Sequence, residues 1–116
     1  MANILTYEEA KEIYDILNSN LDFSDEDYVF LYNRMVSNAV YYANIRAGWN
    51  ALSREQKLNS DEGRTMAHNA FISSIGTIAR LEGEIGAKWL ARLSDDRKRI
   101  GDFACYIALF QAIDAR

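Results

Sequence analysis

The stretch Ser24–Leu52, which reads SDEDYVFLYNRMVSNAVYYANIRAGWNAL, decides the fold of this chain. It opens with Ser24 and three acidic residues, a pattern typical of a helix start, because an N-cap side chain accepts unpaired N–H groups and the helix dipole favours negative charge there. Within Tyr28–Trp49, large apolar side chains recur at three- and four-residue steps, which aligns them along one side of a helix. We therefore predict one long helix that bends near Gly48 or ends near Leu52.

The composition favours a single all-α domain. The chain has 116 residues, of which 49% are hydrophobic, and this supplies enough apolar surface for a core. It contains no proline and only six glycines, so long helices are favoured over tightly turned sheets. We predict a compact bundle of four main helices plus a short helical segment, spanning residues 1–116, with dimerisation left open.

Capping signals and apolar periodicity locate the other helices. Thr6 with Glu9 three residues later predicts a capping box at the start of the first of them. The expected helices are, approximately, Tyr7–Asn18, Asp61–Leu81, Lys88–Leu93 and Asp95–Asp114. The last of these should bury Ile100, Phe103, Ala104, Ile107, Phe110 and Ile113.

Polar and glycine-containing segments predict where helices end or approach closely. The segment Asn59–Gly63 indicates a break followed by a new helix cap. Gly83 and Gly86 predict a corner in the second half of the chain. Gly76 lies inside an expected helix, where glycine costs about 1 kcal/mol relative to alanine, so we expect another helix to pack closely against it.

Charge and hydropathy limit the location and the classes of partner. No run of about 18 apolar residues is present, so we predict no membrane span. The first residues lack the basic and apolar regions of a signal peptide, and we expect a cytoplasmic protein. The net charge of −4 disfavours nucleic acid as a partner, because it gives no long-range attraction to phosphates. Cys105, the one cysteine, lies in an apolar run and is expected to be buried.

The acidic pattern Glu8-Glu9-x-x-Glu12 is a candidate metal site. Carboxylates three or four residues apart lie together on one face of a helix. The pattern resembles the first acidic motif of MazG-like nucleotide pyrophosphohydrolases, a resemblance that implies Mg²⁺ held against the phosphates of a substrate. No second Glu-x-x-Asp helix follows at a suitable distance, so a solvated acidic helix face remains the alternative.

A second candidate is a DNA-binding corner. Ala79-x-x-x-Gly83 with Trp89 downstream resembles a helix-turn-helix, which implies that the second helix could enter a major groove. Glu82 and Glu84 stand near the turn at positions that this motif usually makes apolar, so a glycine-hinged corner with a solvated basic surface is the alternative. Phosphate contacts would come from Lys88, Arg92, Arg97, Lys98 and Arg99.

His68 has no partner in the sequence that indicates chemistry. Ile72 stands four residues later, where a second metal ligand would be expected, and no nucleophile-elbow motif is present. We therefore predict a surface or packed histidine. The sequence predicts no catalytic residue and no cofactor.

Aromatic residues predict a protein interface. Four of the seven tyrosines and one of the two tryptophans lie between Tyr28 and Trp49, and aromatic side chains dominate the binding energy of interfaces. Candidate interface residues are Tyr32, Tyr42 and Trp49, with burial in the core as an equal alternative. The leading hypothesis is a non-catalytic cytoplasmic interaction or regulatory module that binds itself or another protein. The alternatives are a Mg²⁺-dependent nucleotide pyrophosphohydrolase-like enzyme and a DNA-binding regulator.

Overall fold

The structure is a computed structural model that describes residues 4–19, 24–93 and 97–114, with the side chain of Arg97 left out. These residues form helices and connections and include no strand, which confirms the all-α prediction. In chain order the elements are α1 (Tyr7–Ser19), α2 (Glu26–Gly48), the 3₁₀ turn η1 (Trp49–Ala51), α3 (Arg54–Glu82), α4 (Glu84–Leu93) and α5 (Arg97–Asp114).

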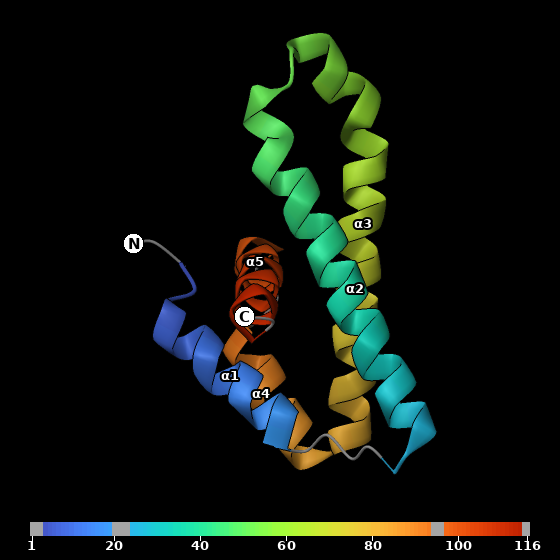
Figure 1. Cartoon of the computed structure of the whole chain (residues 1–116), viewed down its shortest axis with the longest axis vertical. Helices are drawn as coiled ribbons and strands as arrows, with labels where there is room; N and C mark the ends of the chain where they lie inside the picture. The colour runs from blue at the N-terminus through green and yellow to red at the C-terminus, as the bar shows by residue number, and fades with distance from the viewer. Residues whose placement is uncertain (1–3, 20–23, 94–96, 115–116) are drawn as a thin grey trace.

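A long hairpin of α2 and α3 dominates the molecule (Figure 1). Helices α1, α4 and α5 lie beside its lower half, and α5 packs against α1, α2 and α3. The upper half of the hairpin, with η1 at its tip, extends beyond the other helices. We call residues 41–66 the arm, whose base still contacts α5 through the ion pair of Arg46 with Asp102. The molecule measures 46 × 35 × 28 Å along its principal axes, and the hairpin sets the longest dimension.

The start of α1 confirms the predicted capping box. The Glu9 backbone N–H donates to the Thr6 hydroxyl over 3.2 Å, and the Thr6 N–H donates to the Glu9 carboxylate over 3.4 Å. Both groups would otherwise be unpaired at a helix N-terminus. The buried face is the predicted one, formed by Ala10, Ile13, Tyr14 and Leu17.

Helix α2 has the predicted apolar stripe, but its cap lies one residue later. Asp25, and not Ser24, accepts the N–H of Tyr28, over 3.1 Å. The helix ends at Gly48 and continues as η1, in agreement with the predicted end of the element near Leu52. Its buried side includes Tyr28, Tyr32, Met35, Ala39 and Tyr42.

Helix α3 begins at Arg54, so the predicted break at Asn59–Gly63 and the predicted start at Asp61 are wrong. Ser53 and Gln56 form a capping box: the Gln56 N–H donates to the Ser53 hydroxyl over 3.1 Å, and the Ser53 N–H donates to the Gln56 side chain over 2.8 Å. This earlier cap starts the helix. The following polar turns then remain helical although they lie in the exposed arm and bury few side chains.

The predicted corner lies at Gly83, whose positive φ of 67° is a conformation that glycine adopts without strain. Helix α4 starts at Glu84, four residues before the predicted Lys88. Gly86 allows α4 to pack closely on α3, since a Cβ at this position would lie 1.9 Å from the carbonyl oxygen of Ala79. A Cβ at Gly76 would meet only an arginine side chain, at 3.6 Å, so the predicted close approach occurs at Gly86 instead.

Most of the predicted core of α5 is buried, but Ile113 is exposed, so that part of the prediction is wrong. It stands in the last turn of the helix. The predicted cap at Asp95 lies outside the described residues. No described helix combines the length and the apolar character that crossing a membrane requires.

Candidate functional site

The acidic motif of α1 and the basic residues of α4 and α5 pair with each other. The Arg99 guanidinium donates to the Glu9 carboxylate over 3.1 Å, and that of Arg92 donates to Glu12 over 2.7 Å. Arg99 also donates to the backbone oxygens of Ile4, over 3.2 Å, and of Arg92, over 2.7 Å. The acidic residues were candidates for binding a metal ion, and the basic residues were candidates for binding DNA. In the structure they bind each other and so join α1 to α4 and α5.

This pairing leaves no geometric support for the predicted metal site. The hydrogen bond from Arg99 lowers the pKa of the Glu9 carboxyl and outweighs the opposing effect of burial. Glu12 is engaged by Arg92, and Glu8 lies exposed on α1. Among the described residues, no group of three or more histidine, cysteine or acidic side chains could hold a metal ion.

The helix-turn-helix resemblance does not extend to the geometry. One residue, Gly83, separates α3 from α4, whereas the turn of that motif has about three to four residues. Glu82 joins helices across the corner, because its carboxylate accepts from the Tyr28 hydroxyl over 2.8 Å and from the Trp89 indole N–H over 2.9 Å.

The predicted basic face is also divided. Lys88 and Arg92 are exposed on α4, and Arg92 and Arg99 are both engaged with α1. The Lys98 ammonium lies 3.6 Å from the Asp102 carboxylate. The side chain of Arg97 lies outside the described residues, so the prediction for it is not tested.

Two of the three predicted interface residues lie in the core. Tyr32 and Tyr42 are buried within one copy of the chain, and the Tyr32 hydroxyl donates to Asn18 over 2.7 Å. Their burial favours the alternative prediction, that these two tyrosines belong to the core, because Asn18 of α1 lies against Tyr32 and residue 101 of α5 lies against Tyr42. Trp49 is half-buried, and the Arg64 guanidinium carbon lies 4.4 Å from the centre of its ring.

The histidine and the cysteine are packed residues. His68 is 4% exposed, and its ring meets that of Tyr42 edge-on, with centroids 5.0 Å apart. Burial raises the pKa of the Cys105 thiol, and the neighbouring Arg46 guanidinium offsets this only in part. A thiol is a weak nucleophile until it is deprotonated, so Cys105 is not an activated nucleophile.

The arm carries three exposed large apolar side chains that the sequence analysis did not assign to an interface. Tyr41, Leu58 and Met66 are 62, 73 and 65% exposed, respectively. A groove of about 440 Å³ runs between α2 and α3 on the arm. Its apolar lining comes from Tyr41, Ile45, Trp49 and Leu52. The signal in the sequence was the presence of large apolar residues outside the main stripe of each helix.

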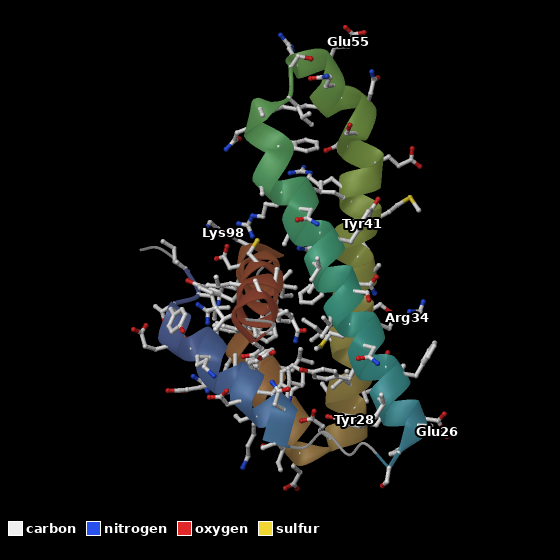
Figure 2. All side chains as sticks on the ribbon, viewed as in Figure 1. Glu26, Tyr28, Arg34, Tyr41, Glu55 and Lys98 are labelled. Atoms are coloured by element: carbon white, nitrogen blue, oxygen red, sulfur yellow. The ribbon has the colours of Figure 1, made fainter. Side chains whose placement is uncertain are left out.

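Figure 2 shows how the labelled residues lie along the hairpin. Glu55 marks the tip of the arm, and Tyr41 lies midway along the hairpin. Lys98 lies at the N-terminal end of α5, across α2 from Tyr41 in this view.

Comparison of the chain with family models, with curated proteins and with solved structures gave no match.

Proposed function

We propose that this chain is a non-catalytic, cytoplasmic protein-interaction module whose docking surface is the arm. The exposure of Tyr41, Leu58 and Met66 on one projecting hairpin is the observation that carries the proposal. Exposed large apolar side chains mark protein-binding surfaces, and one of the three, Tyr41, also lines the groove of the arm. The ion pairs of Glu9 with Arg99 and of Glu12 with Arg92 occupy four of the side chains that the enzyme and DNA alternatives would use, which favours the interaction module over both.

The partner proposed for the arm is a second copy of the chain. The arm offers both projecting apolar side chains and a groove, which is what a two-fold symmetric interface requires of a single surface. Two helical hairpins that pair in this way form a four-helix bundle.

The charges of the arm favour the same partner. The arm carries four basic and three acidic residues, whereas the whole chain has a net charge of −4. Two arms can therefore approach each other without the repulsion that two acidic surfaces would experience. The seven charged residues of the arm are Arg46, Arg54, Glu55, Lys57, Asp61, Glu62 and Arg64.

Light scattering across a concentration series tests this proposal. We expect the parent to dimerise, and Tyr41→Glu and Leu58→Glu each to shift the chain toward monomer, because each substitution places a charge in an apolar contact. Phe30→Glu is the matched control, since Phe30 is an exposed aromatic residue of α2 outside the arm. Circular dichroism checks that each variant is folded. A parent that stays monomeric throughout, or dissociation by Phe30→Glu equal to that by Tyr41→Glu, would refute the proposal.

A further inference from the structure

Two of the residues that line the groove of the arm have no side chain. They are Gly48, the last residue of α2, and Gly63 of α3, and a Cβ built on either would meet nothing within 4 Å. Trp49 and Arg64, the next residue in each case, contact each other, so the two glycines lie at the same level of the hairpin. The groove therefore has open space directly above the backbone at this level.

The fold of a single copy does not account for Gly63. A glycine inside a helix costs about 1 kcal/mol relative to alanine. Gly63 does not have the positive φ that would favour glycine, and no neighbouring atom of the same chain excludes a Cβ there. A side chain from outside the chain that packs above Gly63 would account for the missing Cβ.

The lining of the groove suits an apolar side chain. Tyr41, Ile45, Trp49 and Leu52 supply apolar surface, and among the described residues of the lining Arg64 is the only charged one. Its guanidinium lies 3.1 Å from the Asp61 carboxylate. An apolar group that enters the groove therefore does not have to strip water from an unpaired charge, which would be costly.

Met66 is an exposed apolar side chain beside this space. It is 65% exposed, and it stands three residues after Gly63 and seven after Asn59, which both line the groove. Residues at these spacings share one face of a helix. The flexible thioether of methionine fits irregular apolar spaces well. One face of α3 therefore carries both an open space and, next to it, an apolar side chain that could fill such a space.

Two-fold symmetry can bring these two features together. In a two-fold pair, residue i of one copy contacts residue j of the other, and j contacts i. Gly63 and Met66 are only ~4.5 Å apart along the axis of α3. If two α3 helices pair antiparallel about an axis midway between these residues, Met66 of each copy lies over Gly63 of the other. We propose that Met66 of a second copy fills the groove above Gly63 and so sets the register of the dimer. This inference rests on the function proposed for the arm.

A double-mutant cycle between Gly63 and Met66 tests the contact. Light scattering across a concentration series gives the dissociation constants of the parent, Gly63→Leu, Met66→Ala and the double variant. Leucine is needed because the one carbon of an alanine would leave most of a groove of about 440 Å³ open. Circular dichroism checks that each variant is folded. Asn69→Leu and Leu81→Ala are the matched controls, because both residues are exposed on α3 outside the arm.

We expect Gly63→Leu and Met66→Ala each to weaken the dimer about tenfold, or ~1.4 kcal/mol, the first by filling the space and the second by emptying it. The double variant should recover to within about threefold of the parent, because the leucine supplies the volume that the methionine loses. Both controls should dimerise like the parent. If the parent dimerises but the double variant is weaker than either single variant, or neither single variant weakens it, the contact is overturned and the arm can remain the interface. A monomeric parent would overturn both proposals.

Discussion

Replacing Gly86 with alanine should destabilise the protein, although alanine is the better helix former. The added Cβ would lie 1.9 Å from the Ala79 carbonyl oxygen and 2.6 Å from its carbonyl carbon. Both are backbone atoms of α3, so no side-chain rotation relieves the clash. To restore ordinary contact, α3 and α4 must separate by roughly 1.5 Å, a gap that forfeits most of the dispersion energy between the facing atoms.

The expected loss follows from what this contact holds together. Trp89 and Leu93 of α4 are fully buried, and both would lose packing if the helices separated. Overpacking of a core costs about 1–3 kcal/mol, and the intrinsic gain of alanine over glycine in a helix is about 1 kcal/mol. Because the clash is between backbones, we expect a cost near the upper end of this range, which leaves a net loss of roughly 2 kcal/mol of unfolding free energy.

Urea unfolding followed by circular dichroism measures this loss, and Gly63→Ala is the matched control. Gly63 also lies inside α3, but a Cβ there would meet nothing within 4 Å. We expect Gly63→Ala to stabilise the protein by ~0.5–1 kcal/mol, because it lowers the entropy of the unfolded chain without strain. If Gly86→Ala and Gly63→Ala change the stability in the same direction, the close contact between α3 and α4 is refuted.

Two further predictions concern the helix caps and the ion pairs of α1. Ser53→Ala should cost about 1 kcal/mol in urea unfolding, because it removes the acceptor for the Gln56 N–H, and an unchanged midpoint would contradict the start of α3 at Arg54. Glu9, whose pKa Arg99 lowers, stabilises the fold above the ordinary carboxyl pKa of 4.5, and this contribution is lost as the pH falls through the lower pKa of the folded state. Glu9→Gln should therefore reduce stability at neutral pH by less than about 1 kcal/mol and flatten its decline in acid; an acid-unfolding curve parallel to that of the parent would contradict this.

The sequence alone could not show how the candidate site residues pair, because their partners lie in distant parts of the chain. Glu9 and Arg99 are 90 residues apart, and Glu12 and Arg92 are 80 residues apart. The acidic residues and the basic residues each resembled a binding motif, because the sequence shows their charge and spacing but not the residues of the same chain with which they pair. Only the packing of α1 beside α4 and α5 shows that the two sets neutralise each other.

The same limit applies to the aromatic residues. The apolar stripe of α2 predicts which residues share a face, but not how many neighbouring helices cover that face. Tyr42 and Tyr41 are adjacent in the sequence, yet α5 covers the first and leaves the second exposed. A partner surface could therefore be expected on this helix but not assigned to particular residues.

The sequence by itself determined the all-α class, the capping box at Thr6, the apolar stripe of α2 and the corner at Gly83. These features depend on residues within one or two helical turns of each other, so local periodicity and hydrogen bonding are sufficient to specify them. Only the tertiary structure decided that the arm projects, that Gly86 is the glycine of close approach, and that Arg46, Arg64 and Lys98 line one hollow. The physical reason is that these features require three helices to be placed relative to one another, and a local pattern does not encode that placement.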